Sequence, residues 1–220
     1  MNFKKLNSPN FSKALRKSSD IKFIIIHYTG MQSKIESIKR LLNPKSKVSC
    51  HYLIDRKGQI IRMVEEAHVA WHAGKSKWKN FVDLNYNSIG IELVNKGHKH
   101  GYENFTNLQI NQLIKLCLKL KKKYNISSSN IVGHSDIAPL RKQDPGEKFP
   151  WKKFEQKKLV FATQNLELKT DDIKTKKMKI CFFKNLYKLG YRYFNPNKPN
   201  QKDRYLIKAF QRRFLPKNIT

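Results

Sequence analysis

Three short apolar runs that end in polar, ligand-capable residues constrain the fold of this chain most strongly. They cover residues 22–30 (KFIIIHYTG), 88–95 (SIGIELVN) and 130–134 (NIVGH). Short runs rich in Ile and Val, bounded by polar residues, are typical of buried strands. Stretches with apolar side chains at helical spacing alternate with these runs. The pattern therefore predicts an α/β fold in which helices flank a central mixed β-sheet.

Two helices and a hairpin are predicted around these strands. Residues 33–42 and 106–124 place apolar side chains on one helical face, and each stretch opens with a Ser or Thr that can cap a helix. Residues 48–54 and 59–64 have strand character, and the turn Asp55-Arg-Lys-Gly58 between them is typical of a hairpin. The chain of 220 residues is long enough for these elements to enclose a core.

The composition changes near the C-terminus. Residues 152–220 hold 19 Lys and Arg against 5 Asp and Glu, and strand-like runs no longer occur. Two amphipathic helices are expected there instead, at about 177–189 and 203–214. We place a domain boundary near residues 165–175. The predicted units are a basic N-terminal arm (1–20), a catalytic-type domain (21–165) and a small all-α module (170–220).

The net charge of +30 has two explanations. It comes from 46 Lys and Arg against 16 Asp and Glu. A lysine-rich surface can be merely solvated, or it can attract a polyanion such as nucleic acid, an anionic membrane or an anionic cell wall. No nucleic-acid-binding motif accompanies the charge, which argues against nucleic acid as the partner.

Targeting signals and disulfides are not expected. No run approaches the ~18 apolar residues of a membrane span, and no apolar stretch follows the first lysines as in a secretory signal. The three cysteines are scattered, which excludes a disulfide framework as the basis of the fold.

Residues that can bind a metal ion gather at the predicted strand ends. His27 and His134 each lie at the end of an apolar run, and Asp144 follows on a loop rich in Pro and Gly. A catalytic zinc ion takes three ligands of this kind and keeps one position open for water. On composition alone, three other histidines compete for the same role: His51, His68 and His72.

Two further residues have the chemistry that a zinc hydrolase needs. Glu92 is a carboxylate inside an apolar strand, which suits a general base, although a paired structural Glu is equally compatible with that position. Lys142 lies two residues before Asp144 and can stabilise a developing oxyanion, although most lysines in such a basic chain lie on the surface.

Six segments together give the chain a family resemblance. The chain resembles the zinc-dependent N-acetylmuramoyl-L-alanine amidases of the type 2 amidase group, which includes the peptidoglycan recognition proteins. The segments occur in the order and spacing of that family over about 130 residues, and several together are more specific than any single histidine. They are IIIHYTG (24–30), SCHYLID (49–55), AWHAG (70–74), SIGIELVN (88–95), GHSDIAPLRKQDPG (133–146) and FPW (149–151).

The resemblance implies a site and a reaction. It assigns one catalytic zinc ion to His27, His134 and Asp144, the proton transfer to Glu92 and oxyanion stabilisation to Lys142. The implied reaction is hydrolysis of the amide between N-acetylmuramic acid, or its 1,6-anhydro form, and L-alanine in peptidoglycan or muropeptides. A non-catalytic peptidoglycan recognition protein of the same fold is the alternative. Four more residues are expected to line the substrate cleft: His51, Trp71, His72 and Asn95.

The C-terminal segment resembles the helical peptidoglycan-binding module that some of these amidases carry. The matching pieces are YKLGY (187–191) and LIKAFQRRF (206–214), but the further helix found in relatives does not follow. Phe210, Phe214 and Leu215 therefore either lack cover or pack on the catalytic domain. We expect a monomer of the bacterial cell envelope; the cytoplasm, where a subgroup recycles muropeptides, is the alternative.

Overall fold

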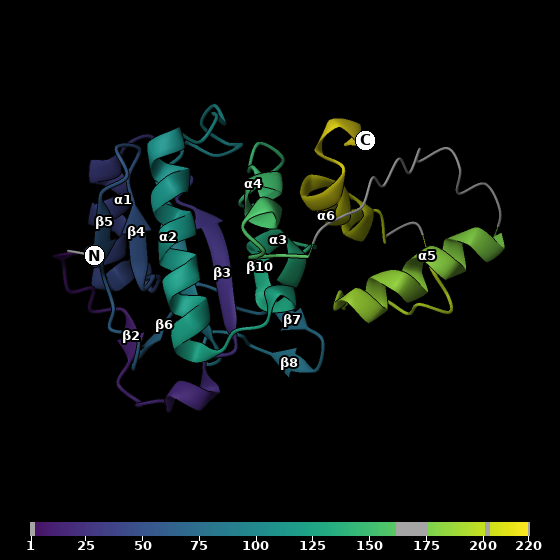
Figure 1. Ribbon diagram of the computed structural model, residues 1–220, viewed down its shortest axis with the longest axis horizontal. Coiled ribbons are helices and arrows are strands. Elements are labelled where there is room, and N and C mark those ends of the chain that lie inside the picture. Colours follow the sequence, from purple (N-terminus) through teal and green to yellow (C-terminus); the bar gives the residue numbers. More distant parts are fainter. Residues whose placement is uncertain (1–2, 162–175, 201–202, 220) are drawn as a thin grey trace.

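The structure is a computed structural model that describes residues 3–161, 176–200 and 203–219 (Figure 1). A mixed sheet with helices packed on both faces makes up the main body, and two helices follow it toward the C-terminus (Figure 1). The boundary expected near residues 165–175 lies outside the described residues.

A six-stranded mixed sheet confirms the predicted fold class. Its strands are β1 (Lys4–Lys5), β3 (Phe23–Tyr28), β4 (Tyr52–Ile54), β5 (Ile60–Arg62), β9 (Ser88–Leu93) and β10 (Ile131–Gly133). They are ordered β1-β5-β4-β9-β3-β10. The strands from β4 to β10 in this order run parallel, whereas β5 forms the predicted antiparallel hairpin with β4. Two smaller pairs join β2 (Phe11–Ser12) to β6 (Val69–Ala70) and β7 (Lys77–Trp78) to β8 (Phe81–Val82).

The two helices predicted next to the strands begin where the sequence places them. The Ser33 hydroxyl accepts a hydrogen bond from the Glu36 amide, and the Thr106 hydroxyl accepts one from the Gln109 amide, so both residues act as N-caps. The α-helices are α1 (Lys34–Leu42), α2 (Asn107–Tyr124), α3 (His134–Ile137), α4 (Trp151–Gln156), α5 (Lys176–Leu189) and α6 (Arg204–Phe214). Short 3-10 turns occupy Ser18–Asp20, Pro44–Ser46, Ser128–Asn130 and Pro216–Asn218.

Side chains along each strand alternate between the two faces of the sheet. One face packs into the apolar core beneath α2, and the other carries predicted functional residues. On β3 and β9, Ile24, Ile26, Ile89 and Ile91 pack into the core beneath α2. The intervening residues point to the opposite face because successive side chains of a strand alternate. His27 lies on that opposite face, and its partner in the parallel register is Glu92. Two of the predicted functional residues are therefore neighbours across two adjacent strands.

Residues 3–20 do not form the expected basic arm. Strand β1 pairs with β5, and β2 pairs with β6. Arg16 is buried, and its guanidinium donates to the carbonyl oxygens of Glu66, Tyr86 and Ser88 at 2.7–3.0 Å. The expectation failed because this segment is held by backbone pairing and by polar side chains that bind carbonyl groups. Neither interaction leaves an apolar pattern in the sequence.

The C-terminal helices α5 and α6 pack on the chemistry-bearing side of the sheet next to β10. Phe183, Leu186 and Phe210 share one buried cluster with Phe23 and Val132 of the sheet. The sequence left open whether Phe210, Phe214 and Leu215 lack cover or pack on the catalytic domain. The structure shows that they pack on it. Among the described residues, no helix combines the length and hydropathy that crossing a membrane requires.

Candidate active site

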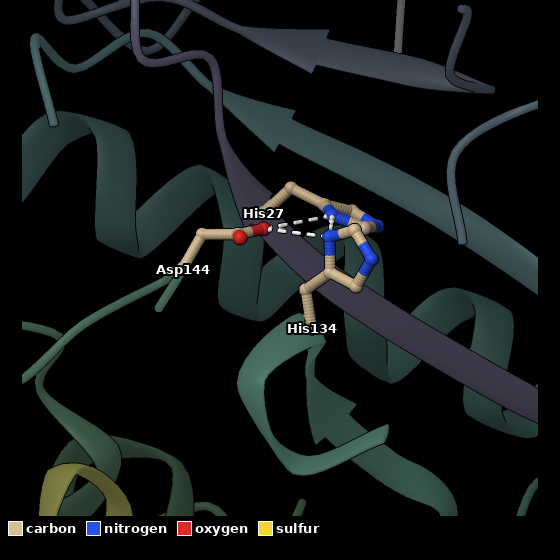
Figure 2. Close-up of side chains that lie close together, drawn as sticks. All are labelled: His27, His134 and Asp144. Atoms are coloured by element: carbon tan, nitrogen blue, oxygen red, sulfur yellow. Dashed lines mark hydrogen bonds and ion pairs between the residues drawn. The ribbon is translucent and has the colours of Figure 1, made fainter. Parts of the chain in front are cut away.

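Three buried side chains converge at one edge of the sheet (Figure 2). His27 comes from the end of β3, His134 is the first residue of α3, and Asp144 lies on the loop that follows. The Nδ1 atoms of the two histidines lie 2.9 Å apart, and Oδ2 of Asp144 lies 2.9 Å from one and 3.0 Å from the other. The structure thus brings together the three residues that the sequence singled out as metal ligands, which form a group able to hold a metal ion.

The hydrogen-bond partner of Nε2 determines which nitrogen of His134 carries the hydrogen and which one faces Asp144. Nε2 of His134 lies 3.1 Å from the carbonyl oxygen of Ala73, and a carbonyl can only accept. In its neutral form His134 therefore carries its hydrogen on Nε2 and directs the lone pair of Nδ1 toward His27 and Asp144. Burial, followed by the proximity of His134, lowers the pKa of His27 to about 4, so that ring is neutral at pH 7.

The arrangement of His27, His134 and Asp144 favours a bound cation. Burial raises the pKa of the Asp144 carboxyl, but the proximity of His134 and His27 outweighs it, and the net pKa lies well below its usual value. The Nδ1 atoms of two imidazoles and one carboxylate oxygen thus point at the same small volume. This nitrogen and oxygen donor set fits a zinc ion with one open coordination position.

The backbone around His134 differs from the expected loop. Residues 134–137 form the single turn α3 instead of entering the loop directly. The Ser135 amide donates to the Asp144 carbonyl at 2.8 Å, so the turn and the loop are joined beside both candidate ligands. This backbone contact brings His134 and Asp144 close together, although ten residues separate them in the sequence.

A cavity of about 330 Å³ opens next to the three converging side chains. Its lining includes all five residues expected to bind metal or to act in catalysis, and two of the four expected to line the cleft. The latter are Trp71 and His72.

The other two residues expected in the cleft, His51 and Asn95, are buried elsewhere. Nδ1 of His51 accepts from the Gly90 amide at 3.0 Å, and Nε2 lies 3.1 Å from the carbonyl oxygen of His68. Burial is the main reason that the pKa of His51 falls to about 3. The Asn95 side chain donates to the Glu103 carbonyl at 2.8 Å. Nε2 of His51 also lies 2.7 Å from Nη2 of Arg16. Neither His51 nor Asn95 is among the residues that line the cavity.

Glu92 is the unusual carboxylate of the cavity. Its Oε2 atom is buried and has no hydrogen-bond partner in the part of the chain that the structure describes. Burial, together with the negative charge of Asp144, raises the pKa of Glu92 to about 8, although Lys142 and Arg40 oppose the shift. A carboxyl group that lines a cavity and has a pKa near neutral pH is suited to accept and return a proton.

Cationic side chains complete the cavity wall. Lys142 was expected there, whereas Arg40 of α1 and Arg141 were not. The Arg141 guanidinium donates to the Ala73 carbonyl, the same oxygen that accepts from His134, and to the Lys75 carbonyl at 2.7 Å. Sequence reasoning missed Arg141 because its partners are backbone carbonyls far away along the chain.

The buried ring of His72 requires a glycine beneath it. A Cβ atom added to Gly90 would lie 2.4–2.5 Å from the His72 ring. Nε2 of His27 lies 3.0 Å from Nδ1 of His72, so this ring also supports a candidate ligand. The close approach explains why the apolar strand SIGIELVN is interrupted by a glycine on this face.

Gly90→Ala is expected to destabilise the protein by about 1–3 kcal/mol, because the added methyl group overpacks a dense region. Chemical denaturation of both proteins measures the difference. The double variant Gly90→Ala/His72→Ala provides the control, since removal of the ring opens the space that the methyl group needs. If the alanine at position 90 costs as much in the His72→Ala background as in the wild type, the clash is not with this ring.

The chain matches one protein-family model and several known proteins. Residues 17–147 match the family model Amidase_2, described as N-acetylmuramoyl-L-alanine amidase. Over 148 residues the chain is 40% identical to N-acetylmuramoyl-L-alanine amidase AmiD of Escherichia coli, a match that covers 62% of this chain and 52% of AmiD. It therefore spans about half the length of that relative.

Two other similarities cover more of the related protein. The 1,6-anhydro-N-acetylmuramyl-L-alanine amidase AmpD of Haemophilus influenzae is 32% identical over 169 residues, which cover 69% of this chain and 89% of AmpD. A solved complex of Escherichia coli AmiD with anhydro-N-acetylmuramic acid-L-Ala-D-gamma-Glu-L-Lys superposes with a TM-score of 0.75 at 31% identity. That superposition covers 94% of this chain and 86% of the AmiD chain.

Proposed function

Because this chain belongs to the N-acetylmuramoyl-L-alanine amidase family, we propose that it hydrolyses the amide between N-acetylmuramic acid, ordinary or 1,6-anhydro, and L-alanine. The substrates would be peptidoglycan or muropeptides. The observation that carries the proposal is the convergence of two imidazole nitrogens and a carboxylate oxygen beside the unpartnered Glu92. A non-catalytic recognition protein would not need this complete set of residues.

His27, His134 and Asp144 would hold one zinc ion. When bound, zinc polarises the amide carbonyl and brings the pKa of water to about 7. The carbonyl oxygen of Ala73 would keep His134 in the tautomer that binds metal, because it occupies the Nε2 hydrogen. Burial of all three side chains excludes bulk water from the centre.

Glu92 would move the proton. Its free Oε2 would take a proton from the attacking water and then deliver it to the nitrogen of L-alanine as the C–N bond breaks. The products are the free muramic carboxylate and the free amino group of the stem peptide. Lys142, which lines the same cavity, would donate to the carbonyl oxygen as negative charge develops there.

Incubation with a purified muramyl peptide tests the proposed activity. We expect mass spectrometry to detect free stem peptide, a chelator to abolish its release, and added zinc to restore it. Parallel reactions with anhydro and reducing-end substrates would show which muramyl end is preferred. If no peptide is released, or if the chelator has no effect, the proposal of a zinc amidase is wrong.

The compartment and the charge belong to the same proposal. We propose that the enzyme acts as a monomer in the bacterial cell envelope, where the net charge of +30 would hold it near anionic glycopeptide. Cell fractionation tests the location. Activity on isolated cell wall that does not change with ionic strength would contradict the role of the charge, because added salt screens such attraction.

A further inference from the structure

A buried carboxylate in the turn that presents His134 depends on the C-terminal segment. Asp136 of α3 is 1% exposed. Its Oδ2 accepts from the Gly133 amide at 2.8 Å and from Nη1 of Arg213 at 2.6 Å, and its Oδ1 accepts from the Tyr191 hydroxyl at 2.6 Å. Two of these three donors come from residues that follow the predicted domain boundary.

Arg213 joins several parts of the main body from the last turn of α6. Besides the ion pair with Asp136, its Nη2 donates to the carbonyl of Ile131 in β10 at 3.0 Å. Its guanidinium also stacks over the Trp151 ring at 4.4 Å. A planar group with several donors suits such a position, and a buried carboxylate without it would be left with an uncompensated charge.

Tyr191 approaches the same carboxylate from the segment that follows α5. It is fully buried, and its ring packs edge-on against Trp78 at 4.9 Å between centroids. Burial and the charge of Asp136 raise the pKa of its hydroxyl well above the usual value, so the hydroxyl keeps its proton and donates. The carboxylate is thus held from two sides by two separate parts of the C-terminal segment.

The position of Asp136 is transmitted to His134 through a short and crowded backbone. Asp136 binds the amide of Gly133, which directly precedes His134. A Cβ atom on Gly133 would lie 2.6 Å from Cδ of Pro145, the residue after Asp144, so this backbone has little room to shift. The Ser135 amide in turn binds the Asp144 carbonyl. Both candidate ligands therefore rest on the turn that Asp136 fixes.

We propose that the C-terminal helices are a structural part of the metal site, and that Tyr191 and Arg213 are positioning residues that act on His134 through Asp136. This role differs from that of the peptidoglycan-binding module that the segment resembles. It rests on the proposed function, in which His134 binds zinc. The neighbouring Arg212 supports it, since its Nη2 donates to Gln143 in the loop that carries Asp144.

Zinc affinity of the full chain, measured by competition with a chromogenic chelator, tests the proposal. Arg213→Met and Tyr191→Phe should each weaken zinc binding about 10-fold, the low end for residues that orient metal ligands. Arg213→Lys should restore part of the loss because it returns the charge without the planar geometry. Arg204→Met is the matched control: it removes one positive charge from the exposed start of the same helix and should bind zinc like the wild type.

A double-mutant cycle tests whether the effect passes through Asp136. In an Asp136→Asn background, Arg213→Met should have little further effect on zinc affinity, because the partner charge is already absent. Melting temperatures of the metal-free proteins, recorded in parallel, show that each variant is folded at the temperature of the titration. Tyr191→Phe removes a single hydroxyl and keeps the test available if Arg213→Met does not fold.

The outcomes separate this inference from the proposed activity. Zinc binding equal to that of the wild type in both Arg213→Met and Tyr191→Phe, with only a lower melting temperature, would overturn the positioning role while leaving the amidase proposal intact. If Arg213→Met weakens zinc binding as much in the Asp136→Asn background as in the wild type, the effect does not pass through Asp136. A wild-type chain that binds no zinc would overturn both proposals together.

Discussion

Glu92→Gln is expected to lower kcat by about 10²–10⁴-fold while zinc stays bound, since general acid–base catalysis contributes about that much. Glutamine keeps the size of the side chain, but it can neither take a proton from water nor return one to the leaving amine. The geometry supports a large effect because Glu92 lines the cavity and its Oε2 has no hydrogen-bond partner among the described residues. Release of stem peptide from a muramyl substrate, measured at saturation, gives kcat.

A second glutamate provides the matched control for Glu92. Glu65→Gln removes one negative charge from an exposed ion pair with Arg62 and should leave kcat unchanged. Zinc content, measured by elemental analysis, should be one ion per chain in the wild type and in both variants. Wild-type turnover in Glu92→Gln would exclude this residue as the proton carrier. Loss of zinc in that variant would instead assign it a role in metal binding.

His134→Ala is expected to remove both zinc binding and activity. The variant keeps two of three ligands, and the loss of a metal that contributes several kcal/mol corresponds to a decrease of about 10³-fold or more in kcat/KM. A ligand that binds only the folded state raises the melting temperature. Added zinc should therefore raise the melting temperature of the wild type and leave that of His134→Ala unchanged.

The control for His134→Ala is His100→Ala, which makes the same substitution at a histidine outside the cavity lining. It should bind zinc and cleave substrate like the wild type. If His134→Ala still shows a zinc-dependent rise in melting temperature of normal size, the ion binds at other residues. If it keeps wild-type activity, the proposed metal centre is wrong.

Local sequence patterns were sufficient for the sheet and for the residues that converge. The strands that carry His27 and Glu92 are recognisable because a buried strand is a continuous apolar run, and the parallel order of β9 and β3 then makes the two residues neighbours. The caps at Ser33 and Thr106 are equally local, because a capping side chain binds an amide only three residues away.

The expectations for His51 and for the N-terminal segment, which the structure does not match, have a common physical cause. His51 looked like a residue of the cleft because histidine is ligand-capable, yet both of its nitrogens face backbone groups of distant residues. The first twenty residues looked like a free arm because they are polar, yet Arg16 is buried among the carbonyl groups of residues 66–88. In each case the deciding partners are polar groups of distant segments, and these leave no pattern in the local sequence.

The sequence by itself determined the α/β class, the strand ends that carry chemistry and the identity of the residues that form the candidate site. Only the tertiary structure decided which nitrogen of His134 faces the centre and which expected residues leave the cleft. It also decided that Arg213 and Tyr191 hold Asp136 from 77 and 55 residues away. Strand formation and capping depend on neighbours along the chain, whereas the partner of a buried polar group depends on how distant segments pack.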